Sequence, residues 1–277
     1  MKKVPPSKQS IVRKERKPLE FRSIHCEFDV VSEASASVYG QFGDTKIIVA
    51  MYVCENMLLL LYGPKQSATS TDKGEFECIF KYAKFSSAER YIDSKDSVKR
   101  SFGHQIEQAF GDVILLDKYP KSLIEAHVYV IQCDGNVVSH SINCVGLALM
   151  DAGIDMKDMV TSSQTIRFKT PPSENKEETD NSNSTQQNEF VDYLDPDLLE
   201  ENNVNKECGI TLAVMTHSQK ITLLQMKGSL EISQSKHVFQ LCIQSCLSLA
   251  EILKKQMFER FKEQNEQSKQ ISQIFNS

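Results

Sequence analysis

The chain has 277 residues, of which 40% are hydrophobic, enough to bury a sizeable core and too many for a collagen-like, mucin-like or wholly disordered protein. Its formal net charge of −5 argues against a nucleic-acid binder with a uniformly basic surface, although residues 1–22 are basic and residues 171–207 acidic. The longest apolar run, residues 57–62, is far shorter than the roughly 20 residues that span a bilayer. Because no apolar stretch follows the basic N-terminus, we expect a soluble intracellular protein with no membrane segment and no secretory signal.

The eight cysteines form no CxxC pair, and most lie in apolar runs, which is typical of small buried side chains in a reducing compartment. Cys242 and Cys246 are one helical turn apart, but no histidine with metal-ligand spacing lies near them. We interpret this pair as core residues, and we expect neither a metal nor a cofactor.

The first half of the chain predicts strands and helices in alternation. Residues 1–19, in which prolines stand among charges, predict a flexible basic N-terminal tail, and residues 20–265 a single domain. Two β-rich runs around the Gly43-Asp44 turn predict a hairpin, whose second strand is apolar enough to be buried on both faces. The elements expected next are a strand at 77–85, a helix at 97–117, a strand at 122–133 and a buried helix at 141–153.

The second half begins with a polar stretch, residues 170–190, which predicts a disordered insertion. A second hairpin is predicted from runs at 210–215 and 221–226, followed by a long amphipathic helix at 238–261. Residues 266–277 are a polar C-terminal tail that we expect to fray. Strands and hairpins interleaved with helices indicate an α+β domain.

Four motifs resemble the RNase PH family. They are the run VYGQFGDTKIIV at 38–49, YGPK at 62–65, the Cys133-Asp134-Gly135 turn, and LALMDAGI at 147–154. Each motif is weak alone, and their shared order over roughly residues 19–255 makes the resemblance specific. It implies an RNase PH-like fold, in which mixed sheets of hairpins pack with helices around a ribosomal-protein-like βαβ core.

Within this family, the chain is most similar to the Mtr-type (mRNA-transport) ring subunit of the eukaryotic RNA exosome, with a neighbouring ring subunit as the alternative. The similarity lies in Leu194-Asp195-Pro196, Glu200-Glu201 and the run at 209–215. The chain departs from its relatives at residues 52–61, an apolar insertion between the strand ending near Met51 and the Gly63-Pro64 pair. We interpret it as a retained intron or gene-model error, with a lineage-specific loop as the alternative that transcript sequencing would distinguish.

Active members of the family use phosphate to cleave RNA from its 3′ end, which needs a phosphate site, an acid and basic RNA contacts. In active relatives the phosphate site follows the D-G turn as G-G-T-R or G-S-R-S. Here Val137 and Val138 occupy the hydroxyl and arginine places, and valine offers neither charge nor a hydrogen bond. His140 is expected to stand at the start of the next helix, which a neighbouring serine caps, and to have no catalytic role.

The acid site of active relatives has two aspartates six residues apart, just before the strand that corresponds to 210–215. An ungapped count from that strand gives Gly209 and Asn203, neither of which can donate a proton. Glu200, Glu201 and Glu207 are nearby, and we interpret them as an acidic loop that faces water. The sequence therefore predicts no catalytic residue and no phosphorolytic activity.

The resemblance implies a non-catalytic subunit that supports 3′–5′ RNA processing and degradation, including that of rRNA, by ring assembly and RNA threading. Its partners would be other RNase PH-like exosome subunits in a six-membered ring, RNA-binding cap subunits and single-stranded RNA, and its location the nucleus, nucleolus and cytoplasm. The alternatives are an active phosphate-dependent 3′–5′ exoribonuclease and a stand-alone RNA-binding adaptor of the same fold.

The residues that we expect to contact RNA are basic side chains on a predicted strand, an S-x-x-E-R-like segment and the start of a predicted helix. In relatives a segment of this kind lies near the pore mouth. For each residue the alternative is ordinary surface solubility, and for the basic N-terminus it is a solvated tail. The set is Lys81, Lys84, Arg90, Lys95, Lys99 and Arg100.

Overall fold

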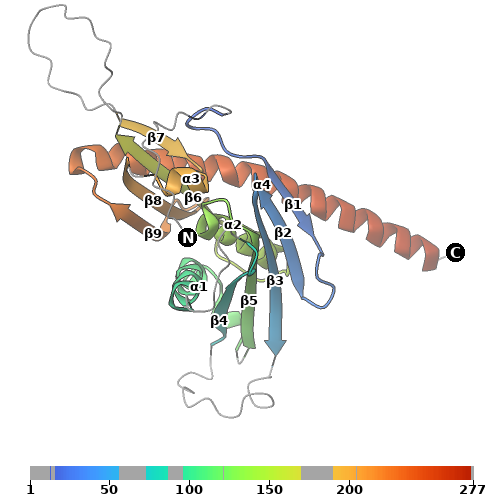
Figure 1. Cartoon of the computed structure of the whole chain (residues 1–277). Helices are drawn as coiled ribbons and strands as arrows, with labels where there is room; N and C mark the ends of the chain where they lie inside the picture. Colours follow the sequence, from blue (N-terminus) through green and yellow to red (C-terminus); the bar gives the residue numbers. More distant parts are fainter. Residues whose placement is uncertain are drawn as a thin grey trace, which may run out of the picture.

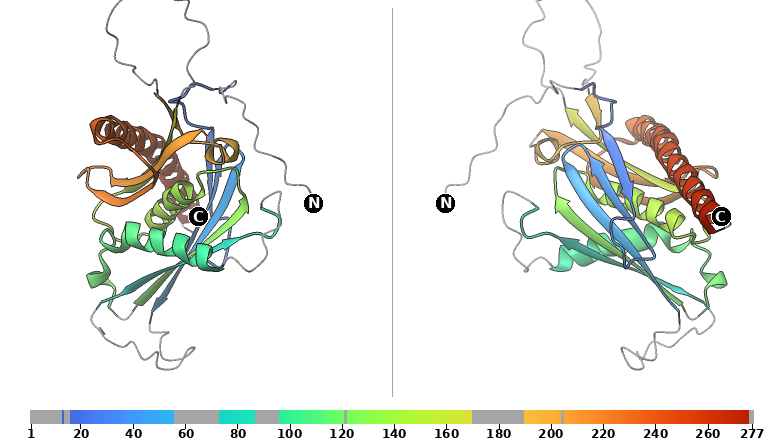
Figure 2. Two further views of the ribbon diagram at one scale, coloured as in Figure 1. Left: turned by 60° about the vertical axis from the view of Figure 1, so that its left-hand side comes forward. Right: turned by 90° about the vertical axis from the view of Figure 1, so that its right-hand side faces the viewer.

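A computed structural model describes Arg13 and residues 16–55, 73–86, 96–120, 122–169, 190–203 and 205–275. These residues form a five-stranded and a four-stranded β-sheet, with the buried helix α2 (Val137–Asp151) between them (Figures 1 and 2). The α+β class predicted from the sequence is therefore confirmed. Among the described residues, no helix is both long and apolar enough to cross a bilayer.

The five-stranded sheet has the order β1-β2-β3-β5-β4. Its strands are β1 (Ile24–Phe28), β2 (Ala36–Phe42), β3 (Thr45–Glu55), β4 (Glu75–Tyr82) and β5 (Ser122–Gln132). The predicted hairpin is β2 and β3, which pair with Val38 opposite Val49. Edge strand β4 runs parallel to β5. Parallel neighbours need a crossover connection, and here helix α1 (Asp96–Gly111) lies in it.

Only one face of this sheet is fully buried. Along β5, Ile124, Ala126 and Val128 point into the core against α1 and α2 and are at most 1% exposed. The alternate residues His127 and Tyr129 point to the opposite face, where Tyr129 is 41% exposed. The sheet therefore presents a partly exposed face that carries large side chains.

The four-stranded sheet has the order β7-β6-β8-β9 and lies between α2 and helix α4 (Ile232–Phe275). Its strands are β6 (Val160–Lys169), β7 (Phe190–Leu194), β8 (Lys206–Met215) and β9 (Ile221–Gly228), with the short helix α3 (Leu198–Glu201) before β8. Strand β6 is rich in Ser and Thr yet buried on both faces, and groups of α2 and α4 satisfy several of its polar atoms. The backbone of Ser162 exchanges two hydrogen bonds of 2.8 and 2.9 Å with the Asn143 amide on α2, and the Thr161 hydroxyl donates to the Cys246 carbonyl on α4.

Cys242 and Cys246 pack against this sheet and are fully buried, as predicted for core residues. Burial raises the pKa of Cys242 to about 12 and that of Cys246 to about 11. Their thiols are therefore un-ionised at neutral pH.

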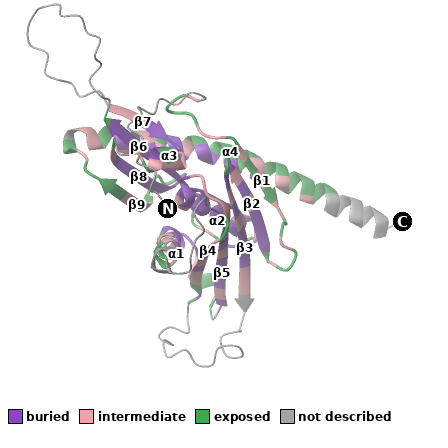
Figure 3. Cartoon of the chain, viewed as in Figure 1, coloured by how far each residue is buried: buried purple, intermediate pink, exposed green. Residues whose placement is uncertain are grey.

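Helix α4 has 44 residues and extends well beyond the predicted range of 238–261 (Figure 3). Its second half runs past the five-stranded sheet, where Gln256 donates to the Ile24 carbonyl and Arg260 pairs with Asp29. The C-terminal tail predicted at 266–277 is helical to Phe275. Its Glu, Lys and Gln residues have high helix propensity, and the tail holds no Gly or Pro to end the helix.

Several predicted boundaries shift. The helix predicted at 97–117 ends at Gly111, and a 3₁₀ turn (Leu116–Lys118) follows. The strand predicted at 77–85 ends at Tyr82. The helix predicted at 141–153 begins at Val137, and its N-cap residue Asn136 makes no side-chain cap bond, so the predicted serine cap is wrong.

The first residues of the insertion predicted at 52–61 form part of a strand. Residues 52–55 continue β3 and pair with residues 122–125 of β5, because β5 is long enough to extend the ladder. These residues are part of a central strand. Residues 56–61 and most of the insertion predicted at 170–190 lie outside the described residues.

The D-G turn offers a prediction about packing. Gly135 has φ of +84°, and an added Cβ would lie 2.7 Å from the Pro196 carbonyl oxygen. Gly153 has a similar φ of +69° but no atom within 4 Å of such a Cβ. We expect Gly135→Ala to lower the free energy of unfolding by about 3 kcal/mol or more, from backbone strain plus overpacking, and Gly153→Ala by about 1 kcal/mol from strain alone. Urea unfolding measures both, and equal losses would contradict the close packing of this turn.

Candidate functional site

The D-G turn lies between β5 and α2, and the segment 195–201 covers it. The Thr45 hydroxyl donates to the Gly135 carbonyl at 3.1 Å and fixes the turn against β3. The backbone N–H of Asn136 donates to the carboxylate of Glu201 at 3.0 Å. Val137 is 8% exposed. The two positions expected to hold a hydroxyl and an arginine in an active enzyme therefore carry a buried and a half-buried valine, and a carboxylate of the chain itself occupies one of the turn's backbone donors.

Asp195 lies at the centre of the charges around this turn. Its carboxylate accepts from Arg22 Nη2 at 2.8 Å and from the Asn136 amide at 2.9 Å, and lies 3.1 Å from His140 Nε2. Burial alone would raise the pKa of Asp195, but its interactions with His140 and Arg22 outweigh burial and hold this pKa well below its usual value. The carboxylate thus compensates the buried guanidinium of Arg22, whose side chain is 7% exposed.

His140 is the fourth residue of α2, and its side chain is only 4% exposed. Its ring stacks on Phe42 with centroids 4.1 Å apart. Burial lowers the pKa of His140 despite the neighbouring Asp195. The ring is part of the packing of this region, in agreement with the expectation that His140 stands near the helix start.

The end of the predicted flexible tail is held in place. Arg13 makes a two-pronged pair with Glu200 at 2.6 and 2.7 Å, and Arg16 donates to Asp197 at 2.8 Å. The side chains of Arg13 and Glu200 are 4% and 3% exposed. Within the tail predicted at 1–19, Arg13 and Arg16 are therefore paired with carboxylates more than 170 residues away in the sequence. Residues 1–12, 14 and 15 lie outside the described residues.

The acidic loop that we expected to face water is also partly buried. Glu200 pairs with Arg13, and Glu201 binds the Asn136 backbone and lines a polar cavity of about 210 Å³. Gly209, one of the two positions taken from the count, lines the same cavity, whereas Asn203 does not. Sequence reasoning missed the other charged lining residues, Lys206 and Lys227, since their convergence depends on the pairing of β8 with β9.

A second cavity, of about 470 Å³, brings together the described members of the predicted RNA-binding set. Lys81 and Lys84 reach it from β4 and the residues just after it, and Lys99 and Arg100 from the first turn of α1. Glu77 is the acidic residue among the lining residues, and Tyr82 and Tyr129 supply aromatic surface. We call this cavity the basic groove. Arg90 and Lys95 lie outside the described residues.

The close packing of α1 on β4 brings the cations at the start of α1 to the edge of the sheet that carries Lys81. At Gly103 the helix comes so close that an added Cβ would be 2.7 Å from the Cys78 carbonyl oxygen. One helical turn later, the Glu107 carboxylate accepts the Cys78 backbone N–H at 2.9 Å. These contacts fix α1 on the edge strand, so that Lys99 and Arg100, one turn before Gly103, line the same cavity as Lys81.

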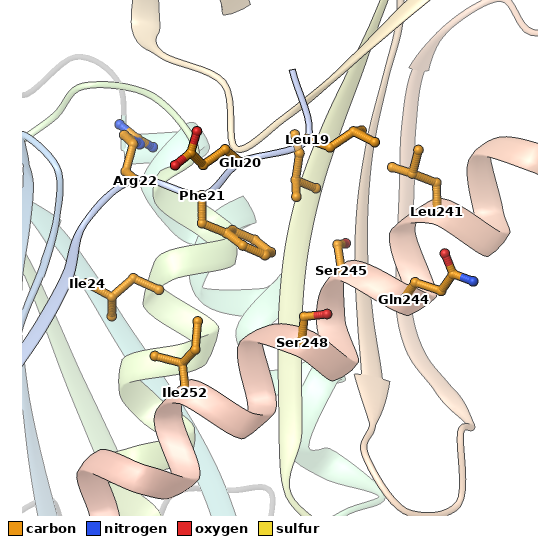
Figure 4. Close-up of a pocket in the computed structure, with 11 residues that line it drawn as sticks. Leu19, Glu20, Phe21, Arg22, Ile24, Leu241, Gln244, Ser245, Ser248 and Ile252 are labelled. Atoms are coloured by element: carbon orange, nitrogen blue, oxygen red, sulfur yellow. The ribbon is translucent and has the colours of Figure 1, made fainter. Parts of the chain in front are cut away.

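The largest of these cavities, about 540 Å³, is apolar in character (Figure 4). Phe21 and Ile24 face Ile252 of α4 across it. Its one basic lining residue, Arg22, has its guanidinium bound to Asp195. This cavity therefore lacks the charge that a phosphate or an RNA backbone needs.

Comparisons with known proteins agree with the fold. Residues 20–155 match the family model described as "3' exoribonuclease family, domain 1" (RNase PH). The Exosome complex component RRP41 homolog of Arabidopsis thaliana is 28% identical over 252 residues, 88% of this chain and 90% of that protein. The Exosome complex component Rrp41 of Cenarchaeum symbiosum (strain A) is 23% identical over 253 residues, 89% of this chain and 90% of that protein.

A solved structure supports the same fold. The crystal structure of rice (Oryza sativa) Rrp46 superposes with a TM-score of 0.67 at 14% sequence identity, covering 88% of this chain and 98% of that one. The order of strands and helices, the family match and this superposition all agree with the motifs that first indicated the family. Residues 20–155 therefore form an RNase PH domain, and the chain has an RNase PH-like fold.

Proposed function

We propose that this protein is a non-catalytic subunit of an exosome ring, of the Mtr type, that holds and guides single-stranded RNA. The observation that carries the proposal is the D-G turn, where Val137 and Val138 replace phosphate-binding groups and Glu201 occupies the Asn136 backbone donor. An anion at this turn would meet a carboxylate and valine methyl groups. Loss of a single oxyanion-type contact costs on the order of a hundredfold in rate or more.

Assembly into a ring rests on the relatives, since two proteins that are similar over most of this chain are named exosome components. The partners we propose are other RNase PH-like subunits, RNA-binding cap subunits and single-stranded RNA. We place the complex in the nucleus, nucleolus and cytoplasm, where it supports RNA processing and degradation. The basic groove supplies the RNA contact.

Affinity purification of the tagged full-length protein from its own cells tests the ring. We expect mass spectrometry to recover other RNase PH-like subunits and cap proteins, in a complex far larger than one chain. A folded, soluble protein that travels alone would contradict ring membership and favour the stand-alone adaptor.

A second experiment tests the absence of catalysis. The purified chain and the purified complex are each incubated with 5′-labelled single-stranded RNA, with and without inorganic phosphate. We expect no phosphate-dependent shortening of the RNA by the chain alone. Any phosphate-dependent shortening by the complex should be the same with Lys206→Gln or Glu201→Gln as with the wild-type chain. Shortening that needs phosphate and disappears in these variants would assign phosphorolysis to the small polar cavity, which Glu201, Lys206 and Lys227 line.

A further inference from the structure

The basic groove contains an aromatic side chain that its charge does not explain. Tyr129 lies on β5, next to the edge strand, on the partly exposed face of the sheet, opposite Ile48 of β3 and Lys81 of β4. Its neighbours in sequence, Val128 and Val130, are 1% and 0% exposed on the other face, whereas Tyr129 is 41% exposed. The strand pleat thus directs a large ring toward solvent at the side of a cationic cavity.

We propose that Tyr129 is a stacking platform for one base of single-stranded RNA bound in the basic groove, an inference that rests on the proposed RNA-guiding function. The register sets Lys81 directly opposite Tyr129, so the two side chains leave the sheet on the same face. Lys84, Lys99 and Arg100 complete the cationic lining. A nucleotide that stacks its base on the ring then has its phosphates beside these cations.

The charge of the groove favours RNA over a protein partner. Four cations against Glu77 give a formal lining charge of +3 (4 − 1). Lysine is depleted in the cores of protein interfaces, whereas cations combined with an exposed aromatic ring are the usual composition of single-strand sites. A duplex would keep its bases paired and out of reach of the ring.

A stacking contact also suits a subunit that guides single-stranded RNA of any sequence. Every base has a π-face, so a tyrosine ring binds all four with modest preference and reads no base edge. Contact with the phosphates adds affinity without adding sequence specificity. The groove would therefore bind RNA in general and release it easily at higher salt.

The test compares Tyr129→Leu and Tyr129→Phe by fluorescence anisotropy, with full-length protein and labelled 10-nucleotide RNA at several salt concentrations. We expect Tyr129→Leu to weaken binding by about 5- to 100-fold and Tyr129→Phe to change it little, with the salt slope the same in all three proteins. Tyr39→Leu is the matched control, since Tyr39 lies opposite Ile48 on the same face, two strands from Tyr129. We expect it to keep wild-type affinity.

An RNA with abasic nucleotides separates stacking from structural damage. The wild-type protein should bind this abasic RNA as weakly as Tyr129→Leu binds normal RNA. Tyr129→Leu should not weaken binding of the abasic RNA any further. Equal weakening on normal and abasic RNA, or unchanged affinity on both, would overturn the stacking role while leaving RNA binding intact. If wild type binds no RNA at all, the proposed RNA-guiding function fails first. If Tyr129→Leu keeps its RNA affinity and loses only protein partners, the face is a protein interface and the inference is wrong.

Discussion

Asp195→Asn is expected to lower the free energy of unfolding by about 3–5 kcal/mol, because it removes the negative charge that compensates buried Arg22. Two atoms of Arg22, its backbone N and Nε, donate to Asp195 Oδ2 at 3.1 Å each, and Nη2 donates to Oδ1 at 2.8 Å. Asparagine keeps the shape but puts an NH₂ group against these donors. Urea unfolding of the full-length protein, followed by far-UV circular dichroism, measures the loss.

Asp155→Asn is the matched control for this prediction. Asp155 also pairs with a cation, Lys118, at 2.7 Å, but both side chains are more than half exposed, at 53% and 57%. Water screens such a pair, so its loss should cost less than about 1 kcal/mol. A similar small loss for Asp195→Asn, with an unchanged denaturant slope, would mean that the charge network around the D-G turn contributes little to stability.

The parts of the fold that could be predicted are those with a local pattern. The hairpin at Gly43-Asp44, the strand β5 and the hairpin of β8 and β9 each combine a β-rich run with a turn. Helix α2 is apolar almost all round, which indicates burial without knowledge of its neighbours. In these segments the chain itself specifies the element.

Other strands depend on contacts that a local pattern does not contain. Strand β6 has three Ser or Thr residues among its first four and gives no apolar alternation, so it was not predicted. It is stable because Asn143 and the carbonyls of Cys242 and Cys246 bind its polar groups. Strands β1 and β7 are five residues each, too short for a periodic signal.

The candidate sites show the same division. The sequence identified the four described cations of the basic groove, since charge on a strand and at a helix start can be read directly. It missed Tyr129, whose exposure depends on which face of β5 the helices cover. It also interpreted Glu200 and Glu201 as exposed, since the partners that bury them, Arg13 and Asn136, are distant in sequence.

Neutralising the basic groove is expected to produce the largest functional effect. Replacing its four cations by glutamine should weaken binding of single-stranded RNA by about 100- to 1,000-fold at roughly 0.1 M salt. Each phosphate contact that is lost no longer releases counterions from the RNA, and this release favours binding. The slope of log K against log salt should become less negative by about 3, at about 0.7 for each contact. Anisotropy titrations at four or more salt concentrations measure both quantities. The substituted residues are Lys81, Lys84, Lys99 and Arg100.

A matched variant separates a local site from net charge. In this second variant the groove is intact and four exposed lysines on α4 are replaced by glutamine. Each of the two variants therefore has a formal charge of −9 instead of −5. If RNA binds in the basic groove, the α4 variant should keep nearly the wild-type affinity and slope, since screening limits the reach of a distant exposed charge to about 10 Å. Equal losses in the two variants would mean that RNA responds to overall charge and that the groove is not its site. The control lysines are Lys236, Lys254, Lys255 and Lys262.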